Sequence, residues 1–295
     1  MILVADSGST KTDWVLAPDT CSSNKSDHSF TKVKTQGINP FHQSMDRIEA
    51  IMQNELITHL SNEMGTDSPL NAISSVAFYG AGCNEASIPM MTDIMQKLFP
   101  TAAIDVASDM LGAARALFGD EQGVACILGT GSNSCYYDGR KMLRNIPPLG
   151  YILGDEGGGA SMGKLFLNGI FKGTISNEIR DRYLENEGFV YTDVIEAVYR
   201  KPLPHRFLAS ISKFILKNIS ELELQDLVRR NFDLFFKNNI RQYDDFGNRK
   251  ISAIGSIAHY FKNLFIEIAK NNDYEVIDVV QSPLEGLLSY HQQHR

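Results

Sequence analysis

Short apolar runs alternate with polar, glycine-containing loops along most of this sequence, and the pattern predicts a mixed α/β protein. The shorter apolar runs predict strands over residues 1–5, 13–16, 30–34, 72–79, 103–107, 124–128, 135–137, 251–254 and 276–280. Apolar residues near helical spacing predict helices over residues 45–57, 110–117 and 255–268, a mostly helical stretch over 160–239, and a terminal helix that starts at Pro283.

Two of the predicted strands run directly into tight turns that are rich in Gly, Ser and Thr. The first turn is Asp6-Ser7-Gly8-Ser9-Thr10-Lys11-Thr12, and the second is Gly129-Thr130-Gly131-Ser132-Asn133-Ser134. Each is followed by another apolar run, so both are typical of a strand–turn–strand hairpin. Glycine lets backbone N–H groups approach an anion closely, and hydroxyl groups add further donors. The pair therefore predicts a site that binds one polyphosphate from two sides.

The second hairpin also repeats the first in shape, which suggests that the chain contains two α/β halves with a cleft between them. With 295 residues, 43% of them hydrophobic, the chain is long enough for a full core and two domains. The formal net charge of -7 argues against a nucleic-acid or membrane-surface partner, although it does not exclude a nucleotide.

Cysteine usage and hydropathy indicate a cytoplasmic protein. Cys21, Cys83, Cys126 and Cys135 form no Cys-x-x-Cys motif, and we expect reduced thiols. No apolar run approaches the roughly 18 residues that a membrane-spanning helix needs. The chain starts directly on a predicted strand, without the apolar leader of a secretory signal.

Two familiar nucleotide motifs begin but are not completed. Residues 158–164 fit the first seven positions of a P-loop, but Leu165 stands where a magnesium-binding hydroxyl is required, so we expect a glycine-rich entry to a helix. Gly129-Thr130-Gly131 starts like a dinucleotide fingerprint, but the third glycine is absent and a strand follows in place of a helix.

Two carboxylates stand at the ends of predicted strands. Asp6 suits a Mg²⁺ ion bound through water and phosphates, although it could equally cap the turn. Asp109 could accept a proton from an attacking hydroxyl, and it could also cap the helix that starts at Met110. From the residues alone, both interpretations stay open.

Taken in order, these motifs resemble the sugar kinase/Hsc70/actin superfamily. Within it they resemble the N-acetylglucosamine kinases and the related activator ATPases of 2-hydroxyacyl-CoA dehydratases and benzoyl-CoA reductase. The resemblance rests on residues 6–12, 108–109 with 112–113, 129–133, 150–157, 255–258 and 283–286. It implies two ribonuclease-H-like domains flanking an ATP cleft, over residues 1–110 and 111–283. A helical insertion over about 160–245 belongs to the second domain, and the terminal helix, about 284–295, packs back on the first.

The resemblance also implies a role for each matching residue. The β- and γ-phosphates of ATP would be bound by Ser7, Gly8, Ser9, Thr10, Lys11, Thr12, Thr130 and Gly131, with Asp6 on the Mg²⁺ ion. Gly255 and Ser256 would lie near adenosine. Asp109 would be the general base. The sugar would contact Asn39, Asn133, Gly150 and Asp155.

We therefore expect an ATP-dependent kinase that phosphorylates an amino sugar, with the 6-hydroxyl of N-acetylglucosamine favoured. Pro147-Pro148-Leu149 stands where many N-acetylglucosamine kinases have Gly-Gly-Trp, which leaves the exact sugar open. One alternative is an activator-type ATPase with a cysteine-bound iron–sulfur cluster, for which Cys83 is the only loop cysteine of interest. Another is a non-catalytic sugar or nucleotide sensor. Whether the protein forms a homodimer also stays open.

Overall fold

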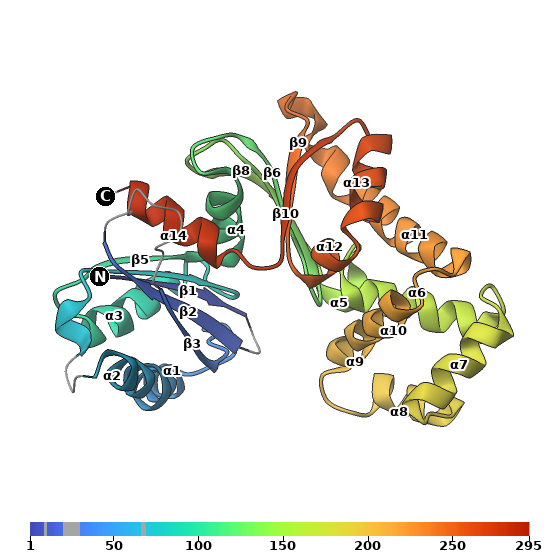
Figure 1. The fold of residues 1–295 in the computed structure, drawn as a ribbon, viewed down its shortest axis with the longest axis horizontal. Helices are drawn as coiled ribbons and strands as arrows, with labels where there is room; N and C mark the ends of the chain where they lie inside the picture. Colours follow the sequence, from blue (N-terminus) through green and yellow to red (C-terminus); the bar gives the residue numbers. More distant parts are fainter. Residues whose placement is uncertain (9–10, 20–29, 66–68, 295) are drawn as a thin grey trace. The chain divides into compact units, whose positions relative to one another are not determined.

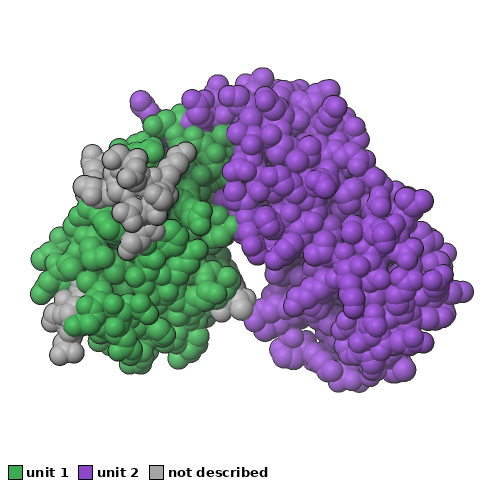
Figure 2. All heavy atoms as spheres, viewed as in Figure 1, with its two compact units in different colours: residues 1–120, 282–295 green, residues 121–281 purple. Residues whose placement is uncertain are grey.

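The computed structural model describes residues 1–8, 11–19, 30–65 and 69–294. The chain divides into two compact units, residues 1–120 with 282–295 and residues 121–281 (Figure 2). Each unit is built on one five-stranded mixed sheet with helices packed against it (Figure 1). The predicted α/β fold class is confirmed. Among the described residues, no helix combines the length and the apolar character that crossing a bilayer requires.

The sheet of the first unit has the strand order β3-β2-β1-β4-β5. Its strands are β1 (Ile2–Ser7), β2 (Lys11–Ala17), β3 (Thr31–Gln36), β4 (Ser75–Gly80) and β5 (Ala103–Ser108). The pairs β1–β2 and β2–β3 are antiparallel, whereas β1–β4 and β4–β5 are parallel. The carboxyl ends of β1, β3, β4 and β5 therefore meet at one edge of the sheet.

Helices cover both faces of this sheet, because alternate residues of each strand point to opposite sides. Leu3 and Ala5 of β1 lie in the core beneath the first group of helices, whereas Ile2 and Val4 pack with Leu284 and Leu287 of the terminal helix. The first group comprises α1 (Met45–Ile51), α2 (Thr58–Met64) and α3 (Ile88–Leu98), and the opposite face carries α4 (Asp109–Phe118) and α14 (Leu284–Gln293) (Figure 1). A π-helical segment η1 (Met52–Ile57) joins α1 to α2, and a 3₁₀ turn η2 (Pro69–Ala72) precedes β4.

The second unit repeats the topology of the first. Its sheet order is β10-β9-β6-β7-β8, in which the antiparallel pairs β6–β7 and β7–β8 are followed by the parallel pairs β6–β9 and β9–β10. The strands are β6 (Gly123–Leu128), β7 (Ser132–Tyr137), β8 (Met142–Ile146), β9 (Lys250–Ile254) and β10 (Glu275–Val280). The likeness in shape between the two hairpins is thus part of a likeness between two whole sheets.

The helices of the second unit enclose one large apolar core. They are α5 (Gly150–Leu153), α6 (Gly159–Lys172), α7 (Asn177–Glu187), α8 (Tyr191–Tyr199), α9 (Pro204–Ser210), α10 (Ser212–Lys217), α11 (Leu222–Asn238), α12 (Ser256–Tyr260) and α13 (Lys262–Asn271), with a 3₁₀ segment η3 (Ile240–Phe246). Phe166, Phe232, Phe236 and Phe265 are fully buried in this core. Each buried aromatic ring removes a large apolar area from water, so the helical insertion and the sheet stabilise each other.

Three features differ from the sequence expectations. Strand β8 was not predicted, because its residues are only half buried and polar side chains interrupt the apolar pattern. The helix expected over 255–268 is two helices that meet at the buried Phe261. The first unit extends to residue 120 rather than 110, because α4 packs against α14 and its own sheet.

Three cysteines are buried free thiols: Cys83, Cys126 and Cys135. Burial, with a smaller contribution from the nearby Asp109 carboxylate, raises the pKa of Cys83 to about 12. A thiol with such a pKa is protonated at neutral pH and a poor nucleophile. Cys21 lies outside the described residues.

Candidate functional site

In the first unit, the candidate polar residues gather at the edge where the parallel strands end. Asp6 is the last but one residue of β1, Asn39 follows β3, and Asp109 follows β5. Ligands of open α/β sheets bind outside the carboxyl ends of the strands. The strand directions therefore bring residues more than 100 positions apart in the sequence to the same edge.

Asp6 and Asp109 are two partly buried carboxylates that interact electrostatically. Burial raises the pKa of Asp6 to about 7, and the negative charges of Asp109 and Asp13 contribute to this rise, while Lys11 opposes it. Burial also raises the pKa of Asp109. Mg²⁺ is commonly bound by one or two carboxylates together with water and substrate phosphates, so this donor set fits a Mg²⁺–nucleotide complex.

The start of α4 separates the two roles considered for Asp109. The helix N-cap is Ser108, whose Oγ accepts a hydrogen bond from the Leu111 N–H at 3.2 Å. Asp109 is the first helical residue, and its Oδ1 accepts from the Met110 N–H at 2.8 Å. Because Ser108 caps the helix, the Asp109 carboxylate is not needed for that role.

The first hairpin closes through its backbone, where the Gly8 N–H donates to the Lys11 carbonyl at 3.0 Å. The Lys11 ammonium forms an ion pair with Asp13 at 2.5 Å and remains largely exposed. An exposed cation at this turn is suited to a phosphate oxygen. The expected phosphate contacts of Ser9 and Thr10 fall outside the described residues.

Ser7 and Thr12 differ from the expectation that their hydroxyls face a phosphate. Both side chains are fully buried, and their hydroxyl oxygens lie 2.6 Å apart. Ser7 Oγ donates to the Ile38 carbonyl at 2.8 Å, and the Ile38 N–H donates back to Ser7 Oγ and Thr12 Oγ1 at 3.1 and 3.2 Å. These hydroxyls therefore hold the loop after β3.

Asn39 is held in one orientation. Its side-chain Oδ1 accepts from the Phe41 N–H at 3.0 Å, and its backbone N–H donates to Gln43 Oε1 at 2.9 Å. Gly82 stands directly against the side-chain amide, since a Cβ built on Gly82 would lie 2.1 Å from Asn39 Oδ1. Neither Gln43 nor Gly82 was singled out from the sequence.

In the second unit, the turn of the second hairpin is bound by the start of α6. The Gly159 N–H donates to the Gly129 carbonyl, and the Ala160 N–H donates to the Thr130 carbonyl, both at 2.8 Å. The free N–H groups at the helix start are thus satisfied by the hairpin, as the expected glycine-rich helix entry requires. A Cβ on Gly158 would lie 2.6 Å from the Gly131 carbonyl carbon, so these two glycines allow the close approach.

Asp155 lies beside the same turn. Its Oδ1 accepts a long hydrogen bond of 3.4 Å from the Ser132 N–H, and a Cβ built on Gly131 would lie 2.6 Å from its Oδ2. The Asp155 backbone has φ 58°, which is unfavourable for a residue other than glycine. Burial raises the pKa of Asp155, while the Ser132 N–H and the Lys164 ammonium lower it. Backbone strain beside a partly buried carboxylate is typical of functional sites.

The remaining predicted residues of the second unit lie around the same edge. Gly255 has φ 118°, and a Cβ there would lie 2.3 Å from the Leu128 carbonyl oxygen, so the start of α12 packs on the hairpin. Ser256 is exposed at the first position of that helix. Asn133 Oδ1 accepts from Asn145 Nδ2 at 2.8 Å, and Gly150 lies exposed with φ 73°.

Sequence reasoning missed Asn231, which is fully buried on α11. Its Oδ1 accepts from the Gly157 N–H at 3.2 Å, and its Nδ2 donates to the Gly158 carbonyl at 3.3 Å. Asn231 therefore fixes the loop between Asp155 and α6. A lone Asn in an amphipathic helix gives no sequence signal of this role.

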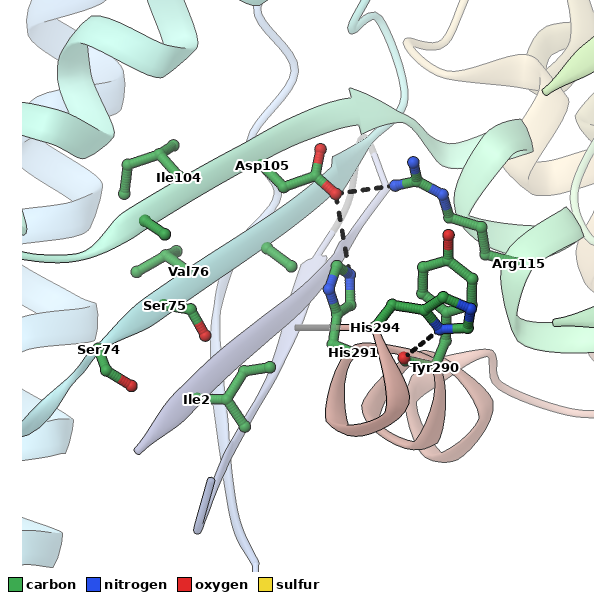
Figure 3. Close-up of a pocket in the computed structure, with 12 residues that line it drawn as sticks. Ile2, Ser74, Ser75, Val76, Ile104, Asp105, Arg115, Tyr290, His291 and His294 are labelled. Carbon is green, nitrogen blue, oxygen red and sulfur yellow. Dashed lines mark hydrogen bonds and ion pairs between the residues drawn. The ribbon is translucent and has the colours of Figure 1, made fainter. Parts of the chain in front are cut away.

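A cavity of about 550 Å³ lies elsewhere in the first unit, at the amino ends of β1, β4 and β5 (Figure 3). Its polar lining includes the Asp105–Arg115 ion pair at 2.8 Å and His291, whose Nε2 lies 2.7 Å from the Tyr79 hydroxyl. These groups join α4, α14 and the sheet. The cavity is therefore separate from the edge that carries Asp6 and Asp109.

Several solved structures are similar to this chain in fold. A candidate N-acetylglucosamine kinase from Porphyromonas gingivalis is 41% identical, with a TM-score of 0.89 over 100% of this chain and 99% of that one. A candidate N-acetylglucosamine kinase from Chromobacterium violaceum is 17% identical, with a TM-score of 0.70 over 98% of both chains. A Streptomyces griseus glucokinase of the ROK family, solved with glucose and AMPPNP, is 15% identical, with a TM-score of 0.53 over 99% of this chain and 98% of that one.

No family model matches this chain, and no curated protein matches its sequence. The two ribonuclease-H-like sheets, together with these neighbours, define a protein of the sugar kinase/Hsc70/actin superfamily. Within that superfamily the chain belongs to the N-acetylglucosamine kinase-like family, whose enzymes are phosphotransferases with an alcohol group as acceptor. The resemblance found in the sequence and the predicted fold are thereby confirmed.

Proposed function

We propose that this protein is an ATP-dependent kinase that transfers the γ-phosphate of ATP to a hydroxyl of an amino sugar, with the 6-hydroxyl of N-acetylglucosamine as the favoured acceptor. The observation that carries the proposal is the pair of partly buried, interacting carboxylates, Asp6 and Asp109, at the strand edge next to the Asn39 loop. The 41% identity to the Porphyromonas gingivalis protein supports it.

In this proposal Asp109 is the general base. The attacking sugar oxygen forms a bond to the γ-phosphorus, the bond from that phosphorus to the β,γ-bridging oxygen breaks, and the sugar proton passes to the Asp109 carboxylate. A raised pKa makes the ionised carboxylate a better proton acceptor. The hydrogen bond from the Met110 N–H fixes one carboxylate oxygen and so orients the group.

The nucleotide is assigned to the two hairpins. Lys11 supplies a cation and Gly8 a close backbone approach in the first unit, and Thr130 and Gly131 supply the turn of the second hairpin. Gly255 and Ser256 are assigned to the adenosine. When bound through Asp6, Mg²⁺ would neutralise phosphate charge that develops during transfer.

The acceptor sugar is assigned to side chains whose orientation is already fixed. Asn39 is held by Phe41 and Gln43, and Asn133 is held by Asn145. Asp155 would accept hydrogen bonds from sugar hydroxyls, and Gly150 would border the ring. Preorganised polar groups of this kind bind hydroxyls with little further loss of side-chain entropy.

A coupled ADP-release assay over N-acetylglucosamine, N-acetylmannosamine, glucosamine and glucose tests the proposal. We expect the highest kcat/KM with N-acetylglucosamine, and phosphorus-coupled NMR of the product should show the phosphate on carbon 6. If none of the four sugars stimulates ADP release, the kinase assignment is refuted. A preference for another sugar would refute only the choice of acceptor.

A further inference from the structure

The hydroxyl groups of Ser7 and Thr12 face each other at the base of the first hairpin. Ser7 is the last residue of β1, Thr12 is the second residue of β2, and the two are directly paired in the sheet. The turn between them is the segment that we assign to the ATP phosphates. Both side chains are fully buried, so neither hydroxyl is open to solvent or to a ligand on the surface of the turn.

The hydrogen bonds use every donor that these two hydroxyls have. A hydroxyl group carries one proton. The Ser7 hydroxyl donates a hydrogen bond to the Ile38 carbonyl at 2.8 Å. The Thr12 hydroxyl donates to Ser7 Oγ at 2.6 Å or to the Gln36 carbonyl at 3.2 Å. Neither hydroxyl therefore keeps a donor for a phosphate oxygen.

The partner of this hydroxyl pair is the loop that presents Asn39. Residues 37–39 form neither helix nor strand, so their position depends on such side-chain contacts. Ile38 is fully buried; its N–H donates to both hydroxyl oxygens, and its carbonyl accepts a hydrogen bond from Ser7. Asn39 follows it directly. A shift of the hairpin base would therefore move the backbone next to Asn39.

We propose that Ser7 and Thr12 are positioning residues that link the first hairpin to the Asn39 loop, so that ATP on the hairpin and sugar at Asn39 strengthen each other's binding. The link rests on the proposed function for the identity of the two ligands. It replaces the expectation that the two hydroxyls contact phosphate directly.

Thr12→Val tests the link, because it removes one hydroxyl and keeps the shape and the strand preference of the residue. Thr12→Ser keeps the hydroxyl and should restore the wild-type behaviour. Thr92→Val is the matched control, since among the described residues the Thr92 hydroxyl bonds only to the Ile88 carbonyl of its own helix. Melting curves of all four proteins show that the variants are folded.

Titration calorimetry measures the Kd of N-acetylglucosamine without and with Mg·AMPPNP, and the Kd of Mg·AMPPNP alone. In the wild-type protein we expect AMPPNP to tighten sugar binding by about 5-fold or more. Thr12→Val should weaken sugar binding by about 5- to 100-fold and abolish the tightening, with the Kd of AMPPNP alone changed less than about threefold. Weaker AMPPNP binding with an unchanged Kd for the sugar would instead show a direct phosphate contact and overturn the link.

Hydrogen exchange gives a readout that does not require the sugar to be known. The Ile38 N–H is bonded to both hydroxyls, so Thr12→Val should speed its exchange, and Thr92→Val should not. Mg·AMPPNP should slow this exchange in the wild-type protein and not in Thr12→Val. Equal exchange in both proteins would refute the link, whereas a wild-type protein that binds no sugar would refute only the proposed function.

Discussion

Gly82 and the side chain of Asn39 are in direct contact, with no room for a Cβ between them. A Cβ built on Gly82 would lie 2.1 Å from Asn39 Oδ1 and 3.1 Å from the Phe41 Cβ, and Gly82 also has φ 82°. We predict that Gly82→Ala displaces the Asn39 amide, raises the KM for the sugar by about 10-fold or more, and lowers the free energy of unfolding by about 1 to 2 kcal/mol. Steady-state kinetics and urea unfolding measure the two effects.

Gly65→Ala is the control for this variant. Gly65 has φ 61°, and a Cβ added there would have no atom of the described residues within 4 Å, so this change brings the backbone strain without the contact. We expect it to lose a similar part of the stability and to keep the wild-type KM. An equal rise in KM in both variants would show that strain, and not the Asn39 contact, is responsible.

Asp109→Asn should lower kcat by about 10²- to 10⁴-fold, because the acceptor hydroxyl loses its proton acceptor. The same change should increase stability at neutral pH. A carboxylate with a raised pKa in the folded state binds its proton more tightly there than in the unfolded chain, so it stabilises the fold only at low pH and costs stability as the pH rises. The stability gain of Asp109→Asn should therefore grow as the pH rises above about 4, as chemical denaturation at several pH values would show. A variant with wild-type turnover would end the assignment of Asp109 as base.

His291 should make the protein less stable in mild acid. Burial, together with the positive charges of Arg115 and His294, outweighs the attraction of Asp105 and lowers the pKa of His291 to about 4 (Figure 3). The unfolded chain therefore takes up a proton near pH 6.5 that the folded protein takes up only near pH 4. The contribution of His291 to stability is complete above about pH 6.5 and falls by at most about 3 kcal/mol as the pH drops towards 4.

His291→Gln should remove this part of the pH dependence. His294→Gln should have the opposite effect, because hydrogen bonds to the Tyr290 carbonyl and to Asp120 at 2.8 Å raise the pKa of His294 and stabilise its charged form. Unfolding free energies between pH 4 and 7 distinguish the two. Parallel curves for wild type and His291→Gln would contradict the prediction.

Gly131→Ala should disturb Asp155, since the added Cβ would lie 2.6 Å from its Oδ2. We expect kcat/KM for the sugar to fall by about 10-fold or more, a size in keeping with loss of one well-oriented hydrogen bond to a charged group. Gly129→Ala lies in the same turn, and its new Cβ would have no atom of the described part of the chain within 4 Å, so kcat/KM should fall less. Equal losses would mean that the turn, and not Asp155, is sensitive at Gly131.

Apart from β8, the strands of both sheets and the two hairpins could be predicted from the sequence, because their apolar residues are contiguous and their turns are local. The residues that fix the site could not, because their partners are distant in the chain. From the sequence, the Ser7 hydroxyl is expected to donate a hydrogen bond to phosphate. In the fold it donates to the carbonyl of Ile38, 31 residues later. Asn231 reaches Gly157 across 74 residues. In each case the type of residue was informative, and its partner was decided by the fold.

Strand β8 and the N-cap of α4 show two further limits of local patterns. The half-exposed β8 lacks the apolar alternation on which strand prediction depends. Ser108 and Asp109 are both good N-cap residues, and only the backbone geometry shows that Ser108 takes the role.

The division of the chain has a consequence for the order in which the protein folds during synthesis. Residues 121–281 are continuous in sequence, whereas the first unit is completed only by residues 282–295. Leu284, Leu287 and Leu288 of α14 fill the apolar layer over β1 and α4, so this layer stays open until α14 has been synthesised. The core beneath α1, α2 and α3 contains only residues before position 110, so it does not depend on α14, and only the layer on the opposite face of the sheet has to wait for that helix. A truncation that removes only α14 should leave a nascent first unit dependent on chaperones, with the other unit already folded.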